Sequence, residues 1–164
     1  MNTDLHKMLP EGLVTRLHMR DERITLEVLG GHERSAQTID AGSARKMFER
    51  IRHEPATADE LESAISDIED HLMPALRQLP APRRLVTSEP EVFRIAELLR
   101  SSDPLTARLE LTEIEQLFNR LADVAHGMPA AALGIPADRS FAATLLILRE
   151  ILHHGGFDSV ELVQ

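Results

Sequence analysis

Apolar and polar positions near the start of the chain alternate in short runs. Residues 12–19 and 22–29 are rich in apolar side chains, and the charged residues 20–23 lie between them. This pattern predicts a β-hairpin with a polar turn. The two glycines that follow predict a second tight turn, and residues 33–39 predict a third strand. We therefore expect three antiparallel strands that follow one another along the chain.

After this meander, the apolar positions recur at helical spacing. A short helix is predicted over residues 43–52. Thr57 and Glu60 form a capping-box sequence, in which each side chain bonds the other residue's backbone N–H. This box opens a long amphipathic helix over 59–79, kinked or interrupted near Pro74 because proline lacks the N–H that a helix needs. The apolar positions of this helix are Leu61, Ile65, Ile68, Leu72, Leu76 and Leu79.

Two further capping-box sequences punctuate the second half of the chain. Ser88 with Glu91 opens one helix, and Thr112 with Glu115 opens another that Gly127 ends. The predicted elements of this half are a strand over 83–87, a helix over 90–100, the helix from 112, an apolar helix over 140–154 and a strand over 160–163.

The predicted order of elements is β-β-β-α-α-β-α-α-α-β. A helix between two strands favours parallel pairing through a right-handed crossover, whereas the opening meander is antiparallel. We therefore expect an α/β fold with a mixed sheet of about five strands. The length of 164 residues suits one domain, which we place at 12–164 after an N-terminal tail at 1–11.

Composition narrows the classes of function. The chain has no cysteine, which excludes disulfides, thiolate metal sites and cysteine nucleophiles. Its net charge of −9 and its lack of Trp and Tyr argue against nucleic acid as a ligand. No uncharged run reaches the roughly 18 residues that cross a bilayer, so we expect no membrane partner and a cytoplasmic location.

Five segments together resemble the exopolyphosphatase / guanosine pentaphosphate phosphatase (Ppx/GppA) family. In that family, a stretch like Gly134–Arg139 precedes a buried helix and a closing strand like 156–161. Residues 112–121 look like a family helix, and 26–31 with 39–42 look like its hairpin and the end of its third strand. The resemblance implies a ribonuclease-H-like fold, an actin-like ATPase half-module that matches only the family's second lobe.

The departures from the family concern phosphate binding. The family holds phosphate in two glycine-rich turns of this lobe, because glycine lets several backbone N–H groups approach an anion. Here the first turn has no glycine, and the second carries two carboxylates and a proline. The phosphate-loop positions that the resemblance implies, which we expect to be degenerate, are Arg20, Asp21, Glu22, Thr87, Ser88, Glu89, Pro90 and Glu91.

Histidines and carboxylates suggest weaker metal candidates. Asp67 and His71 lie four residues apart on an acidic helix and could share an ion with one more ligand, although a solvated charged face is the simpler interpretation. His153 and His154 lie at a helix end, where the simpler role is to cap backbone carbonyls. We therefore predict no metal site and no cofactor.

Two charged pairs have alternative roles. Asp138 with Arg139 could be a catalytic carboxylate and its partner, but a helix cap with an ion pair that holds the preceding loop is the simpler role. Arg83 and Arg84 could form an anion site with Arg77, or simply keep the end of a strand soluble. We assign no catalytic residue.

These observations favour a non-catalytic relative of one family lobe, kept for protein interaction or regulation. Whether the chain is an enzyme stays open, with the balance against it. A lone lobe would expose a surface that its missing partner lobe covers, so we expect an apolar face and either a homodimer or a complex with another protein. The alternative is phosphoanhydride binding or hydrolysis, of polyphosphate or a nucleotide, with a partner that supplies the other lobe.

Overall fold

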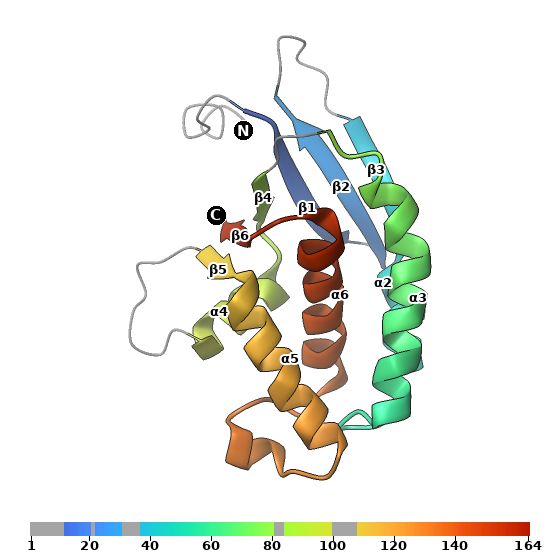
Figure 1. The fold of residues 1–164 in the computed structure, drawn as a ribbon, viewed down its shortest axis with the longest axis vertical. Coiled ribbons are helices and arrows are strands. Elements are labelled where there is room, and N and C mark those ends of the chain that lie inside the picture. The colour runs from blue at the N-terminus through green and yellow to red at the C-terminus, as the bar shows by residue number, and fades with distance from the viewer. Residues whose placement is uncertain (1–11, 21, 31–36, 81–83, 100–107) are drawn as a thin grey trace.

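A computed structural model describes residues 12–20, 22–30, 37–80, 84–99 and 108–164. The elements are arranged as helices against a sheet (Figure 1). In chain order they are β1 (Val14–Arg20), β2 (Arg23–Leu29), β3 (Gln37–Ser43), α2 (Ala44–Arg50), α3 (Ala58–Leu76), β4 (Arg84–Thr87), α4 (Pro90–Leu99), β5 (Arg108–Glu110), α5 (Leu111–Ala125), the 3₁₀ turn η1 (Ala130–Leu133), α6 (Arg139–Gly155) and β6 (Ser159–Leu162).

The sheet is mixed, as predicted, and its strand order is β3-β2-β1-β4-β6-β5. The meander β1–β2–β3 is antiparallel, β4 is parallel to both β1 and β6, and β5 is antiparallel to β6. The sheet has six strands instead of about five, because β5 was not predicted. β5 has only three residues and one buried side chain, Leu109, which is too short to show alternation.

The core lies between the sheet and the helices. Helix α6 packs between α3 and α5 (Figure 1), and α4 also contacts α6. One face of the central strands carries buried apolar residues such as Leu17, Leu26 and Ile39, which are paired across β1, β2 and β3. Burying each such side chain contributes roughly 1.5–3 kcal/mol, and α6 adds an almost continuous run of buried residues from Phe141 to Leu148.

The opposite face of the sheet is mainly polar. Strand residues alternate between faces, so the residues between the apolar ones place half-buried charged and hydroxyl side chains on the other side, together with the buried Val14 and Val86. We call it the polar sheet face, and it carries Arg16, His18, Thr25, Glu27, Arg84 and Glu161. Across the described parts of the chain, the one exposed large hydrophobic side chain is Met128, so the expected apolar face is not found there.

The observed first residues of the helices can be compared with the predicted capping boxes. Thr57 and Glu60 form both bonds of the predicted box, and α3 runs from there through Pro74 to end at Leu76, three residues before the predicted end. The box at α5 is formed by Glu110 and Glu113, two residues before the predicted pair. Both sequences place a glutamate three residues after a possible cap, so spacing alone could not separate them.

Two other boundaries also differ from prediction. Strand β3 begins at Gln37, four residues later than predicted, and the residues before it lie outside the described part of the chain. Helix α4 begins at Pro90, and the carbonyl of Glu89 accepts from Phe93 N–H, so Glu89 and not Ser88 precedes the first turn. In the parts of the chain that the structure covers, no helix is long and apolar enough to cross a membrane.

Candidate functional site

The second predicted phosphate turn begins at the end of β4. The hydroxyl of Thr87, the last residue of β4, is hydrogen-bonded to the backbone. Thr87 is fully buried. Its Oγ1 donates to the carbonyl of Leu17 at 3.1 Å and accepts from the N–H of Glu89 at 3.2 Å. Thr87 therefore joins β1 to the loop that leads into α4 instead of facing a ligand.

The backbone N–H groups of this loop are mostly committed as well. The Glu89 N–H bonds Thr87, Pro90 has none, and the Val92 N–H donates to the Glu89 carbonyl at 3.0 Å. A phosphate cradle needs several such groups aimed at one anion. Three of the four N–H positions from 89 to 92 cannot serve one here.

A carboxylate lies beside this turn. Glu89 is 7% exposed, and its Oε1 has no hydrogen-bond partner and lies 3.9 Å from Nδ1 of His18, which also lacks a partner. On the other side of the ring, His18 Nε2 is 3.3 Å from Glu27 Oε2, and Arg16 NH1 is 3.7 Å from the same oxygen. We call Arg16, His18, Glu27 and Glu89 the Glu89 cluster. Its buried carboxylate repels an approaching phosphate by about 1 kcal/mol or more.

The first predicted phosphate turn is a tight hairpin between β1 and β2. Glu22 has a positive φ of 66°. Its carbonyl accepts from Arg45 N–H and from the Ser43 hydroxyl, both at 3.3 Å, and its carboxylate pairs with the Arg45 guanidinium at 3.1 Å. Exposed Arg20 ends β1, and Asp21 lies outside the described residues.

The strand register keeps the two predicted turns apart. Leu17 on β1 is level with Thr87, the last residue of β4. Strand β1 continues three residues further to Arg20 before the hairpin turns. At roughly 3.3 Å per residue, the hairpin lies about 10 Å beyond the end of β4. The structure therefore does not bring Glu22 together with Glu89.

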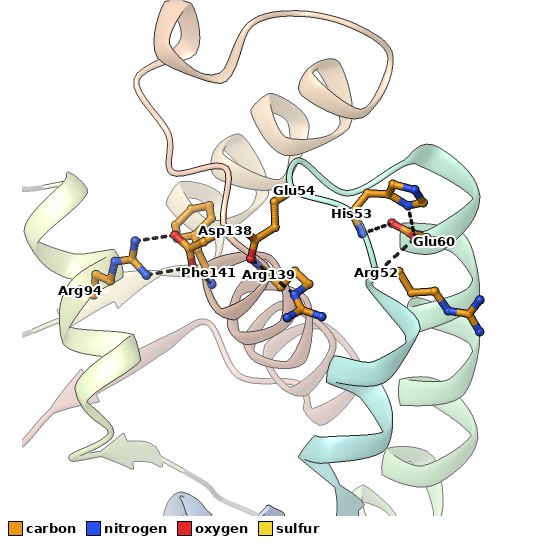
Figure 2. Close-up of polar contacts among 8 residues, drawn as sticks. All are labelled: Arg52, His53, Glu54, Glu60, Arg94, Asp138, Arg139 and Phe141. Carbon is orange, nitrogen blue, oxygen red and sulfur yellow. Dashed lines mark hydrogen bonds and ion pairs between the residues drawn. The ribbon is translucent and has the colours of Figure 1, made fainter.

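The Asp138–Arg139 pair forms a structural junction at the start of α6 (Figure 2). The Asp138 side chain accepts from the Phe141 N–H at 2.9 Å, which confirms the predicted cap. Both of its oxygens also bond Arg94 of α4, at 3.1 and 2.6 Å, and this guanidinium holds the pKa of Asp138 below its ordinary value. Arg139 instead donates to Glu54, from its backbone at 3.1 Å.

Glu60 is the most strongly perturbed carboxylate near this junction (Figure 2). Burial raises its pKa, but bonds from the His53 ring at 2.7 Å and from the N–H groups of Thr57, Arg52 and His53 outweigh burial and bring the pKa to about 2. Every one of these contacts closes the turn before α3. Glu60 therefore serves as the capping-box residue of α3.

The two weak metal candidates, Asp67 and His71, make other contacts. The Asp67 carboxylate bonds Arg50, while His71 Nδ1 lies 2.7 Å from the Asp67 backbone carbonyl. Of the anion-site candidates, Arg84 is bound by Glu161 through two nitrogens, at 3.1 and 2.5 Å, and Arg83 lies outside the described residues.

Three other residues do offer converging metal ligands: His154, which the sequence analysis considered with His153, and two glutamates that it missed. Glu69, Glu150 and His154 place one ligand atom each within 4.8 Å of the others. His153 Nδ1 lies 3.8 Å from Glu115 Oε1, so both histidines at the end of α6 contact carboxylates. The i,i+4 spacing of Glu150 and His154 was the signal in the sequence, but Glu69 comes from a different helix.

The fold is of the ribonuclease-H-like, actin-like type, with a meander followed by crossovers through helices. The sequence matches no protein-family model and no curated protein. Solved structures of the Ppx/GppA group do share its fold.

A crystal structure of the Aquifex aeolicus Ppx/GppA phosphatase, type II variant, matches with a TM-score of 0.72 at 15% identity, over 97% of this chain and 55% of that one. An exopolyphosphatase from Cytophaga hutchinsonii matches with a TM-score of 0.69 at 12% identity, over 95% and 54%. The chain thus spans about half the length of these proteins, as one lobe would.

Proposed function

We propose that this chain is a non-catalytic relative of one Ppx/GppA-type lobe and acts as a protein-interaction or regulatory module. The observation that supports this most directly is the Glu89 cluster. At the turn where the resemblance implies a phosphate cradle, two N–H groups are bonded internally, one is missing, and a buried carboxylate lies beside them. The turn is built to complete itself and to exclude an anion.

Binding of phosphate compounds tests this proposal. Calorimetric titration of the full chain with polyphosphate, guanosine pentaphosphate and ATP should give no saturable binding up to about 1 mM ligand. A dissociation constant of about 1 mM corresponds to a binding free energy of roughly −4 kcal/mol. Saturable micromolar binding of any of them would overturn the proposal and favour phosphoanhydride chemistry with a partner that supplies the other lobe.

A matched pair of variants tests whether the Glu89 carboxylate is what prevents phosphate binding. Glu89→Gln removes the buried negative charge, so residual phosphate binding should strengthen severalfold at low salt. Glu97→Gln removes the same charge from an exposed position on α4, the helix that follows Glu89, and should change little. Equal effects of the two variants would mean that net charge, and not the Glu89 cluster, excludes the anion.

The partner in this proposal is a second copy of the chain, held through the polar sheet face. Exposed apolar surface is scarce in the described residues, so the contact would depend on shape and on charged pairs such as Arg16 with Glu27 and Arg84 with Glu161. Interfaces of standard size are only about as apolar as the rest of a protein surface.

Sedimentation equilibrium measures this association. The chain should dimerise at high micromolar concentration. Thr25→Arg, on the polar sheet face, should weaken the dimer, whereas Ser63→Arg, exposed on α3, should not. A monomer at every concentration would remove the homodimer from the proposal, and equal effects of the two variants would place the contact elsewhere.

A further inference from the structure

Three side chains converge where α3 and α6 cross. His154 Nε2 lies 3.0 Å from Glu150 Oε2, on its own helix, and 3.1 Å from Glu69 Oε1, on α3. We propose that Glu69, Glu150 and His154 bind one divalent transition-metal ion of the Zn²⁺ type. This site lies apart from the Glu89 cluster and does not depend on the proposed function.

Rigid elements position all three ligands. Glu150 and His154 are four residues apart, so they lie one above the other on the same face of α6. The packing of Ile68 and Leu72 on α3 into the core fixes the register that brings Glu69 to this face. A site on two packed helices holds its geometry better than one on loops.

Both carboxylate oxygens compete for one hydrogen at the imidazole. One ring nitrogen carries at most one hydrogen, yet two carboxylate oxygens lie about 3 Å from His154 Nε2. One of them is Oε2 of Glu150, whose side chain is only 2% exposed, so water has little access to it. Replacing the hydrogen by a metal ion satisfies both oxygens and the nitrogen together.

The distances suit such an ion. Zn²⁺ binds imidazole nitrogen and carboxylate oxygen at about 2.0–2.2 Å, which separates neighbouring ligand atoms by roughly 3–3.5 Å. The two nitrogen–oxygen separations in the structure, 3.0 and 3.1 Å, need only small adjustments to reach that geometry.

The local charges also favour a dication. Glu115 adds a third carboxylate nearby, and among the described residues the arginine that pairs with this group is Arg149, which bonds Glu150 at 2.6 Å and Glu115 at 3.2 Å. Three carboxylates against one guanidinium leave a local charge of −2 when the histidines are neutral. The ligands also lie near the C-terminal end of α6, where the helix dipole attracts cations.

The donor set selects the class of metal. One imidazole nitrogen with two carboxylates suits Zn²⁺ or Co²⁺, whereas Mg²⁺ prefers oxygen ligands and keeps most of its water. The Arg149 bond to the other oxygen of Glu150 is the outer-shell contact that orients such a ligand. Glu69 and His154 are 43% and 27% exposed, so a water molecule can take the fourth position.

Titration of the chelator-treated full chain with Zn²⁺ tests the proposal, with the visible absorption of bound Co²⁺ as a second measurement. One ion should bind per chain and raise the melting temperature, because the ion joins α3 to the end of α6. His154→Ala and Glu69→Gln should each weaken binding at least tenfold, since even outer-shell partners contribute 10- to 100-fold. His153→Ala, which removes the neighbouring imidazole, should leave binding unchanged.

Three results would overturn the proposal. The first is the absence of binding at about 1 mM Zn²⁺, which corresponds to a free energy weaker than roughly −4 kcal/mol. The second is equal binding by His154→Ala and the original chain, which would assign the ion to other histidines. The third is displacement of Co²⁺ by a tenfold excess of Mg²⁺, which would exclude a nitrogen ligand. Circular dichroism of each variant confirms that it is folded.

Discussion

Glu60→Gln is the most informative single substitution at the start of α3. The Glu60 carboxylate accepts from the His53 ring and from three backbone N–H groups, of Arg52, His53 and Thr57. Glutamine keeps the shape but replaces one accepting oxygen by an NH₂ group that faces these donors. We expect the variant to fold with lower stability.

The magnitude follows from the pKa of Glu60. A fall from 4.5 to about 2 corresponds to at most roughly 3 kcal/mol in favour of the charged form. The main partner, His53, is 69% exposed, and solvent screening reduces this to about 1–2 kcal/mol. Loss of an ordinary helix cap costs a similar 0.5–2 kcal/mol.

The lowered pKa of Glu60 determines the direction in which its stabilising contribution changes with pH. Because the folded-state pKa is lowered, the stabilisation is present above about pH 4.5 and is lost as the pH falls toward 2. Urea unfolding at several pH values should therefore show a difference between the original chain and Glu60→Gln that shrinks below pH 4.5. Glu62→Gln, exposed on the same helix, is the control. A difference that stays constant between pH 7 and pH 3, or that matches the control, would refute the reasoning.

Three further substitutions test other contacts by urea unfolding. Asp138→Asn removes the charge that Arg94 binds and weakens the cap of α6, so it should cost about 1 kcal/mol; no change would mean that solvent already screens the pair. Gly42→Ala should cost at least 1 kcal/mol, because φ is +108° and the added Cβ would lie 3.0 Å from His71 Cβ; a neutral result would show that the turn relaxes freely. Thr87→Val should cost about 1–3 kcal/mol by leaving two buried backbone groups unpaired, and it should leave phosphate binding unchanged.

The fold was largely predictable because long helices carry strong local signals. The capping box at Thr57 and Glu60 is found where predicted, and so is the apolar helix that Asp138 caps. The elements that differ from prediction, β5 and the start of α5, also have causes in their local sequence. Leu109 gives β5 a single buried position, and Glu110 acts as a helix cap although glutamate is not a preferred residue there.

The candidate sites were less predictable because they depend on distant pairings. Glu69 and His154 are 85 residues apart and meet only because two helices pack. The burial of Glu89 follows from the register of β4 beside β1, which the sequence does not reveal. The sequence shows that residues 87–91 contain no glycine, but the position of Glu89 beside His18 needed the structure.

The position of β6 has a consequence for the order of folding. Residues 159–162 form an interior strand, and β5 joins the sheet only through them. During synthesis, the meander β1–β2–β3 can assemble from neighbouring residues, and β4 can add to β1. Strand β5, made some fifty residues earlier than β6, has no partner until residues 159–162 have left the ribosome. Completion of the sheet is therefore a late, long-range step, of the kind that slows folding and leaves strand edges open to association between nascent chains.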